Sequence, residues 1–176
     1  MVFKETKLKG AYFIELDKIG DERGFFSRLW CKKEMDELNL ESNIVQCNTS
    51  YNKIKGTLRG MHFQNTPYEE TKYVRCTKGA IYDVIVDLRP DSKTFKQWYG
   101  AELTEENGNM LYVPRGFAHG YLTLEDHSEV NYFVTEFYKS DAEGGLRYDD
   151  KSVNIIWPIA ITEISDKDKN RPNFKG

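Results

Sequence analysis

Short apolar runs alternate with polar turn residues along most of this chain. The runs are rich in β-branched and aromatic residues, and clusters of Gly, Pro, Asn and Asp separate them. They span residues 11–16, 44–50, 57–64, 72–77, 80–88, 97–103, 109–113, 119–124 and 129–137. Short strands at regular spacing, with turns between them, indicate a β-sandwich or β-barrel. We therefore expect an all-β fold.

Helical periodicity is limited to one segment. In residues 31–40, Met35 and Leu38 lie on one side of a helix, and charged residues fill the other side. The polar tail 165–176 is expected to be irregular. The chain shows no internal repeat, low-complexity tract or linker. Residues 1–176 are therefore predicted to form one β domain with short peripheral helices.

The strand predicted at residues 80–88 has an unusual pattern. Successive side chains of a strand point to opposite faces, so Asp83, Ile85 and Asp87 share one face. Two acidic residues beside an isoleucine fit the wall of a polar cavity, and they fit a solvated face equally well. The pattern leaves both interpretations open.

Composition limits the kinds of partner. The 176 residues include 25 basic and 28 acidic side chains, a formal net charge of −3, so the chain lacks the basic excess typical of nucleic-acid binding. An anionic ligand would need a local basic cluster. The N-terminal residues hold no apolar stretch, and no run of about 18 apolar residues could span a bilayer. These features predict no membrane association and a cytoplasmic location.

Cysteine and histidine spacing argues against metal sites and disulfides. The three cysteines, at positions 31, 47 and 76, include no Cys-x-x-Cys pair, which favours reduced thiols. The three histidines, at 62, 119 and 127, include no His-x-His or His-x-x-x-His pattern. No Walker motif and no Gly-x-Gly-x-x-Gly motif is present. We therefore predict a reaction without metal or other cofactor.

The segment around His62 is the strongest candidate for proton chemistry. Histidine titrates near neutral pH, and a carboxylate that orients its second nitrogen makes it a better base. His62 lies beside Arg59 and Gln64, which favours a functional role over a structural histidine that bonds a backbone carbonyl. Lys72, at the start of a predicted strand, could stabilise negative charge on a substrate oxygen, or could simply be solvated.

Arg59 and His62 pose a geometric problem. Residues three apart in a regular strand lie on opposite faces, so the two side chains would not share a pocket. A glycine inside a strand often marks a bulge, and Gly60 lies between them. We therefore predict a bulge at Gly60 if both side chains serve one site.

Seven short motifs together resemble the dTDP-4-dehydrorhamnose 3,5-epimerase family. They are DERGFF at 21–26, QCN at 46–48, LRGMHFQ at 58–64, KYVR at 72–75, DVIVDLR at 83–89, PRGFAHG at 114–120 and SDKD at 165–168. The resemblance runs in order from about residue 3 to about residue 172. Each motif alone is weak, whereas the ordered set is highly specific.

The resemblance implies a cupin-type jelly roll, a homodimer, and action on dTDP-4-dehydro-6-deoxyglucose without metal or cofactor, as a step of dTDP-rhamnose and polysaccharide biosynthesis. Carried over by position, His62 matches the general base and Asp168 its carboxylate partner. Tyr132 matches the general acid, and Lys72 the residue near the C4 oxygen of the sugar. Substrate-contact positions fall on Arg23, Gln46, Asn48, Arg59, Lys72, His119, Tyr138, Glu143 and Lys167, with Tyr138 stacking on the thymine.

Some positions differ from the family pattern. Arg28 stands at a position that is often Glu, which reverses a charge predicted to lie beside the ligand, and Phe133 stands where Lys is usual. The catalytic set is complete, so 3,5-epimerisation is the leading hypothesis. The alternatives are a C3-only monoepimerase, a 3,4-ketoisomerase on a related nucleotide sugar, and a non-catalytic carbohydrate-binding jelly roll.

Overall fold

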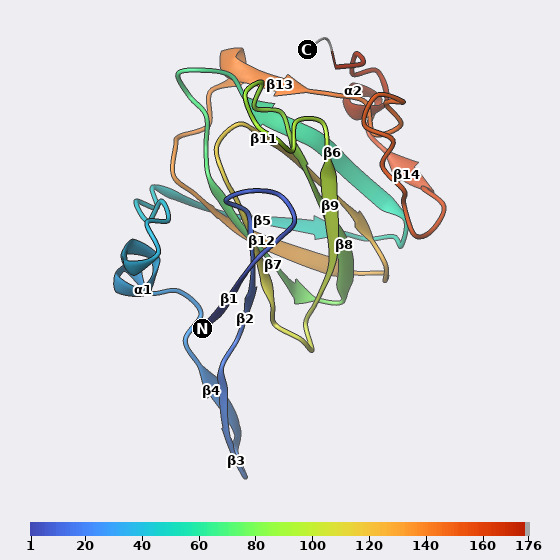
Figure 1. The fold of residues 1–176 in the computed structure, drawn as a ribbon. Coiled ribbons are helices and arrows are strands. Elements are labelled where there is room, and N and C mark those ends of the chain that lie inside the picture. Colours follow the sequence, from blue (N-terminus) through green and yellow to red (C-terminus); the bar gives the residue numbers. More distant parts are fainter. Residues whose placement is uncertain (175–176) are drawn as a thin grey trace.

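Two antiparallel sheets face each other in the computed structural model, which describes residues 1–174 (Figure 1). The first sheet has the order β1 (Val2–Glu5), β2 (Tyr12–Glu15), β10 (Met110–Val113), β7 (Lys72–Lys78), β12 (Ser128–Val134) and β5 (Gln46–Asn52). The second has the order β13 (Glu143–Gly145), β6 (Thr57–Gln64), β11 (Phe117–Thr123), β8 (Ala80–Asp87) and β9 (Trp98–Thr104), and β14 (Glu163–Ile164) runs parallel to β6. From β5 to β8 and from β9 to β12 the chain crosses repeatedly between the sheets. This is the all-β, cupin-type jelly roll that the sequence predicted.

The remaining elements are small. They are a hairpin of β3 (Lys18–Asp21) and β4 (Gly24–Ser27), the helices α1 (Lys32–Glu37) and α2 (Asp166–Lys169), and the 3₁₀ turn η1 (Ser140–Ala142). Each strand predicted from the apolar runs has a counterpart. The predicted helix 31–40 is shorter because Asn39 has a positive φ of 55°, a conformation that stops a helix.

The prediction of an irregular tail was wrong in part. Residues 166–169 form α2, because the Ser165 hydroxyl caps the helix by accepting a hydrogen bond from the Asp168 backbone N–H at 3.1 Å. The last two residues of that tail, and of the predicted domain 1–176, lie outside the described residues. The strands β1, β3, β4, β13 and β14 were not predicted, because they are short or lack alternation.

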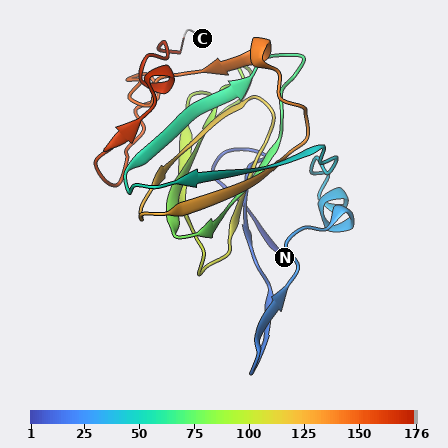
Figure 2. The same cartoon turned by 180° about the vertical axis from the view of Figure 1, so that it is seen from behind.

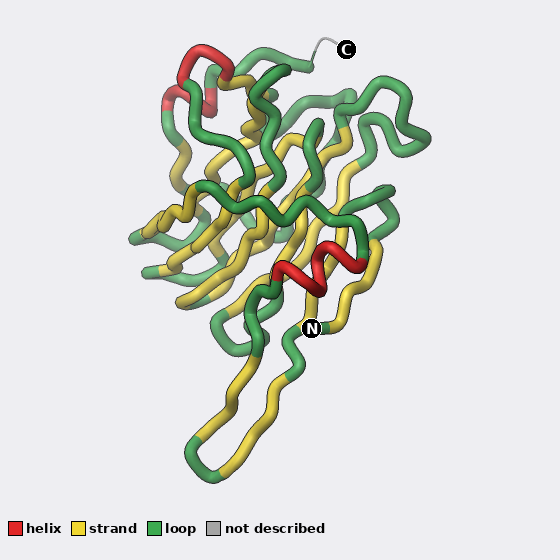
Figure 3. The backbone as a smooth tube through the Cα atoms, turned by 90° about the vertical axis from the view of Figure 1, so that its left-hand side faces the viewer, coloured by secondary structure: helices red, strands yellow, loops and turns green. Residues whose placement is uncertain are grey.

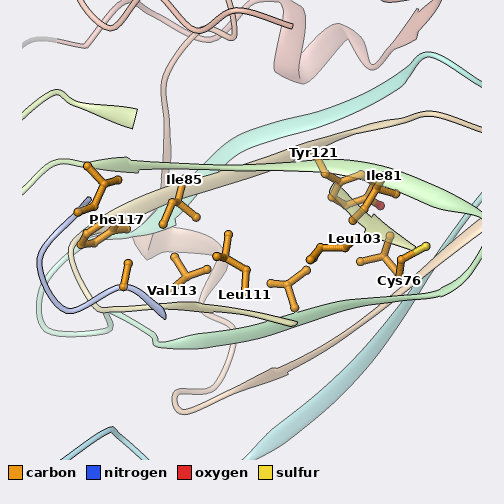
Figure 4. Close-up of a cluster of buried hydrophobic side chains, with 12 residues drawn as sticks. Cys76, Ile81, Ile85, Leu103, Leu111, Val113, Phe117 and Tyr121 are labelled. Carbon is orange, nitrogen blue, oxygen red and sulfur yellow. The ribbon is translucent and has the colours of Figure 1, made fainter. Parts of the chain in front are cut away.

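The main core fills the space between the two sheets (Figure 4). Val74 and Cys76 of β7 meet Ile81 and Ile85 of β8, and all four side chains are fully buried. Ile85 shares its face of β8 with Asp83 and Asp87, and both carboxylates are also fully buried. The acidic face of this strand therefore points inward, which decides between the two interpretations of its pattern.

Each sheet also has a covered outer face. The α1 region packs Met35 and Leu40 against Tyr73 and Met110 of the first sheet. The segment after β13 packs Leu146 and other apolar side chains on the outer face of the second sheet and then returns alongside β6 (Figure 2). This path brings the end of the chain to one mouth of the sandwich. Among residues 1–174, no helix is long and apolar enough to cross a membrane.

The β3–β4 hairpin projects away from the rest of the molecule (Figure 3). Its large apolar side chains are exposed: Ile19 by 67%, Phe25 by 59% and Phe26 by 67%. An extended hairpin with three exposed apolar residues is typical of a contact surface rather than of an isolated loop.

Candidate active site

A cavity of about 460 Å³ opens between the two sheets, beside β5 and β12 of the first and β6 of the second. Its lining comes from both walls and from the C-terminal segment: Gln46, Asn48, Arg59, His62, Phe63, Gln64, Glu70, Lys72, Tyr132, Val134, Tyr138, Glu143, Ser165, Lys167 and Asp168. Most residues that the sequence and the resemblance singled out therefore meet in one place.

A bulge at Gly60 lets Arg59 and His62 share this cavity. In the pairing of β6 with β11, His119 lies opposite His62 and Tyr121 lies opposite Arg59, so β6 contains one extra residue between them. Gly60 has a φ of +130°, and a Cβ there would lie 2.6 Å from the Gly120 Cα. Only glycine fits this conformation and this close approach. The arrangement agrees with the bulge predicted from the sequence.

His62 forms a close pair with Asp168. The His62 Nε2 atom lies 2.6 Å from Asp168 Oδ1. An ionised carboxylate can only accept, so Nε2 carries the hydrogen and Nδ1 keeps its lone pair. The His62 side chain is 35% exposed while the Asp168 side chain is 6% exposed. The pair therefore has a buried acidic end and an imidazole accessible from the cavity, the arrangement a general base requires.

The backbone of the bulge also holds Asp168. The Gly60 N–H donates to Asp168 Oδ2 at 3.2 Å, so both carboxylate oxygens have a partner. Burial opposes ionisation of Asp168, but the hydrogen bonds from His62 and Gly60 outweigh it and lower the pKa of the carboxyl. Asp168 is therefore an anion at neutral pH, which places a negative charge beside the His62 ring.

Lys72 and Tyr132 lie on the opposite wall. Lys72 begins β7 and pairs in register with Val134 of β12, so Tyr132 is its diagonal neighbour on the same face. Burial raises the pKa of Tyr132, and the Glu70 carboxylate raises it further. Tyr132 therefore keeps its proton well above neutral pH, as a general acid must.

Arg59 lines the cavity as a cation without an acidic partner in the described chain. Its Nε donates to Asn52 Oδ1 at 2.7 Å and its Nη2 to the Tyr51 carbonyl at 3.4 Å, both neutral acceptors. Within residues 1–174, no carboxylate forms an ion pair with it. On β5, Gln46 donates from Nε2 to Asn48 Oδ1 at 2.9 Å, which fixes two amides at the cavity edge.

Glu143 gathers a cluster at the cavity mouth. Its Oε2 accepts from the Tyr138 hydroxyl and from Lys167 Nζ, both at 2.8 Å, and its Oε1 accepts from Arg171. Burial opposes its ionisation, but the bonds from Lys167, Tyr138 and Arg171 lower the pKa of Glu143 to about 2. Because Lys167 and Arg171 flank Asp168, the cluster ties the α2 region to β13.

His119 occupies a deeper recess. A second cavity, of about 180 Å³, shares Arg59, His62, Lys72 and Tyr132 with the first and adds His119, Ser50 and Tyr121. His119 Nε2 lies 2.8 Å from Asp83 Oδ1 of the neighbouring strand β8. The acidic face of residues 80–88 therefore supplies the partner of the second histidine.

Two predicted residues lie away from this cavity. Arg23, at the turn of the projecting hairpin, is 89% exposed and bonds Asp21. Arg28 forms an ion pair with Glu34 of α1 at 3.0 Å. Neither lines the cavity within its own chain. The positive charge of Arg28 is paired with the Glu34 carboxylate of α1 and is not directed at the cavity.

The sequence analysis did not identify two residues of the site, Glu70 and Arg171. Glu70 lines the cavity, and its carboxylate lies 2.9 Å from Lys72 Nζ. Its position two residues before Lys72 in an extended segment is a signal that could have identified it. Arg171 gives no local signal at all. Within residues 1–174, no group of three or more His, Cys, Asp or Glu side chains could hold a metal ion. The expectation of a cofactor-free reaction stays a prediction.

Comparison with known proteins places this site in a family. The family model for dTDP-4-dehydrorhamnose 3,5-epimerase matches residues 5–176. A dTDP-4-dehydrorhamnose 3,5-epimerase of Sinorhizobium fredii is 40% identical over 99% of this chain and 90% of its own length.

Crystal structures of such epimerases agree closely with the structure of this chain. That from Elizabethkingia anophelis has a TM-score of 0.96 at 40% identity, covering 99% of this chain and 96% of its own. That from Bacillus anthracis, with TDP and PPi bound, has a TM-score of 0.94 at 44% identity, covering 98% of this chain and 100% of its own. With this match over nearly its whole length, the chain belongs to the dTDP-4-dehydrorhamnose 3,5-epimerase family of isomerases.

Proposed function

We propose that this protein epimerises C3 and C5 of dTDP-4-dehydro-6-deoxy-D-glucose to give dTDP-4-dehydro-L-rhamnose. The observation that carries the proposal is the opposition of two proton-transfer groups across one cavity. The His62–Asp168 pair lies on the β6 wall, and Tyr132 lies on β12 of the facing sheet. A base and an acid on opposite walls can remove a proton from one face of a sugar carbon and return one to the other face.

The first step is proton abstraction. The C4 ketone acidifies the protons on C3 and C5, so the free Nδ1 of His62 can remove one and leave an enolate. Asp168 stabilises the imidazolium that forms, because its pKa is lowered and it stays ionised. The ammonium of Lys72 lies on the same cavity and stabilises the negative charge on the C4 oxygen.

The second step inverts the centre. Tyr132 keeps its hydroxyl proton because burial raises its pKa, and it donates that proton to the face opposite His62. Proton release from the imidazolium and recovery by the tyrosinate restore both groups. One base wall and one acid wall serve both carbons if the sugar shifts between the two inversions.

The rest of the lining suits a nucleoside diphosphate. Arg59 offers a guanidinium that no acid neutralises within the described chain, which a diphosphate requires. Tyr138 lies at the mouth, 57% exposed, where a ring can stack on a thymine. Gln46, Asn48 and Lys167 add polar contacts to the same opening, and His119 faces the inner recess.

A second copy of the chain would explain Arg23. The resemblance predicts that Arg23 contacts the substrate, yet its hairpin projects away from the cavity of its own chain. The exposed Ile19, Phe25 and Phe26 beside it supply an apolar contact surface. We propose a homodimer in which each hairpin carries Arg23 to the cavity of its partner.

The protein is further proposed to act in the cytoplasm as a single domain over residues 1–176. The three cysteines are free, as a reducing compartment keeps them. The two sheets share one core, which supports a single folding unit.

Solvent exchange tests the catalytic proposal. The protein is incubated in heavy water with dTDP-4-dehydro-6-deoxyglucose, and deuterium is located by NMR. Label at both C3 and C5 is the expected result. Label only at C3 indicates a monoepimerase, a rearranged carbonyl indicates a ketoisomerase, and saturable binding without exchange indicates a carbohydrate-binding module. Each of these three outcomes overturns 3,5-epimerisation.

Mixing two inactive variants tests the dimer. His62→Ala lacks the base and Arg23→Ala lacks the hairpin cation. If the hairpin serves the partner, a mixed dimer contains one intact site, so activity should return after subunit exchange. If Arg23 serves its own chain, the mixture stays inactive. Sedimentation of each variant confirms that dimers form.

A further inference from the structure

One charged side chain in the cavity has no role in the reaction described above. Glu70 Oε1 lies 2.9 Å from Lys72 Nζ, and both side chains are only 11% exposed. Both line the cavity that holds His62 and Tyr132. A nearly buried carboxylate beside the group that stabilises the enolate costs desolvation energy, so its presence needs an explanation.

The backbone fixes this carboxylate firmly in place. Thr71, between Glu70 and Lys72, is buried and lines an outer groove on the other side of the chain. Its N–H donates to Thr135 Oγ1 at 3.0 Å, and its carbonyl accepts from the Thr135 N–H at 3.2 Å. Since side chains alternate in an extended segment, the clamp on Thr71 directs both neighbours into the cavity.

Glu70 also lies close to the predicted acid. Tyr132 is the diagonal neighbour of Lys72 across the β7–β12 pairing, and the Glu70 charge helps to raise the pKa of Tyr132. The other titratable or charged groups of the cavity and its recess are Arg59 and His62 on β6, His119 and Tyr121 on β11, and Glu143, Tyr138, Lys167 and Asp168 from the C-terminal side. Of these, Arg59 opposes the effect of Glu70 on Tyr132.

We propose that Glu70 is a positioning residue for the epimerisation: its carboxylate holds the Lys72 ammonium at the C4 oxygen and keeps negative charge facing Tyr132, so that the tyrosine retains its proton. Glu70 itself exchanges no proton with the sugar. The inference rests on the proposed function, because it assigns Glu70 to the same proton-transfer cycle.

Three variants distinguish the contact of Glu70 with Lys72 from the effect of the negative charge of Glu70. Glu70→Ala removes both the acceptor and the charge, and Glu70→Gln keeps an acceptor for Lys72 but removes the charge. Glu69→Gln is the matched control, since Glu69 is also partly buried but does not line the cavity, and it accepts a hydrogen bond from Thr66 Oγ1 at 2.6 Å. We expect kcat to fall by roughly tenfold to a hundredfold in Glu70→Ala and by about threefold in Glu70→Gln, with KM nearly unchanged. The control should match the wild type.

The pH profile gives a readout that a purely structural role would not move. Without the Glu70 charge the pKa of Tyr132 falls, so the alkaline limb of kcat should shift to lower pH in both Glu70 variants and not in the control. An unshifted limb, or a Glu70→Ala enzyme within twofold of the wild type, overturns the proposal. If Glu70→Ala does not fold, the Glu70→Gln profile decides.

A titration without turnover keeps this inference distinct from the proposed function. In protein labelled with ¹³C-tyrosine, the Tyr132 signal is assigned by its loss in Tyr132→Phe. Its midpoint should fall in Glu70→Gln and stay constant in Glu69→Gln. A wild type that exchanges no deuterium overturns the proposed function, whereas an unmoved Tyr132 midpoint overturns the assignment of Glu70.

Discussion

Two histidine–aspartate pairs lie next to each other in this molecule. They contain the same two residue types, but they differ in exposure and in the part of the chain that supplies the aspartate. His62 and His119 are opposite each other across the β6–β11 pairing, and each Nε2 lies within 2.8 Å of a carboxylate oxygen. The His62 side chain is 35% exposed and that of His119 only 9%. Asp83 comes from the adjacent strand, whereas Asp168 comes from a short helix 106 residues beyond His62.

The difference explains why we assign the role of base to the His62 pair and not to the His119 pair. The strand register fixes His119 and Asp83, and Asp83 Oδ2 is buried without a hydrogen-bond partner in the described structure. This pair is nearly buried and lies at the inner recess. The His62 pair exposes its ring to the larger cavity, and both oxygens of Asp168 are bonded. Access to the second ring nitrogen, rather than the pairing itself, separates proton transfer from positioning.

Replacing each histidine in turn should give the largest difference in activity between the two pairs. His62→Ala should lower deuterium exchange at both carbons by roughly 10⁴-fold, since a general base contributes up to that factor, and should change the melting temperature little. His119→Ala should lower exchange about tenfold and cost about 1–3 kcal/mol of stability, because it leaves the buried Asp83 without its partner. Retained exchange in His62→Ala, with folding verified by circular dichroism, would rule out His62 as the base.

Replacing each carboxylate should have the next largest effect. Asp168→Asn removes the charge that stabilises the imidazolium, so kcat should fall by roughly 10² to 10³ with little change in KM. Asp83→Asn should lower kcat less than tenfold, because His119 supports binding rather than proton removal. Steady-state kinetics on both variants provide the comparison. Equal losses in kcat would show that the two pairs contribute alike.

Removing the charge of Glu143, which ties α2 to β13 next to the exposed pair, should have the smallest effect of these substitutions. Folding lowers the pKa of Glu143 from 4.5 to about 2, so its ionised form stabilises the native state above pH 4.5, and this contribution disappears as the pH falls towards 2. Glu143→Gln should therefore melt at a lower temperature than the wild type at neutral pH, and the gap should narrow below pH 4.5. Scanning calorimetry across this range measures it. A gap that is independent of pH would contradict the role assigned to the Glu143 charge.

Much of the β6 wall could be predicted from residues alone. Strand alternation and the glycine between Arg59 and His62 were enough to anticipate a bulge, because bulges depend on local conformation. In the structure, Lys72 and Val74 of β7 share a face as strand alternation requires, and this face lines the cavity and the core. Local patterns predict local geometry.

The C-terminal side of the site could not be predicted in this way. Asp168 was assigned to His62 by resemblance, since a contact across 106 residues leaves no periodic signal in the sequence. The Glu143–Arg171 contact and the projection of the β3–β4 hairpin were missed for the same reason, because tertiary packing decides them. Glu70 lies between these cases: its spacing of two residues from Lys72 could place both side chains on one side of an extended segment, but nothing in the sequence indicates their ion pair.

The path of the C-terminal segment links the proposed catalytic pair to the packing of the second sheet. The same stretch that covers the outer face of the second sheet with Leu146 and Val153 ends in the helix that supplies Asp168. A chain that ended between β13 and α2 would lack Asp168, the partner of His62, and part of the segment that covers the second sheet. Loss of activity and loss of stability would therefore accompany each other in a chain truncated there.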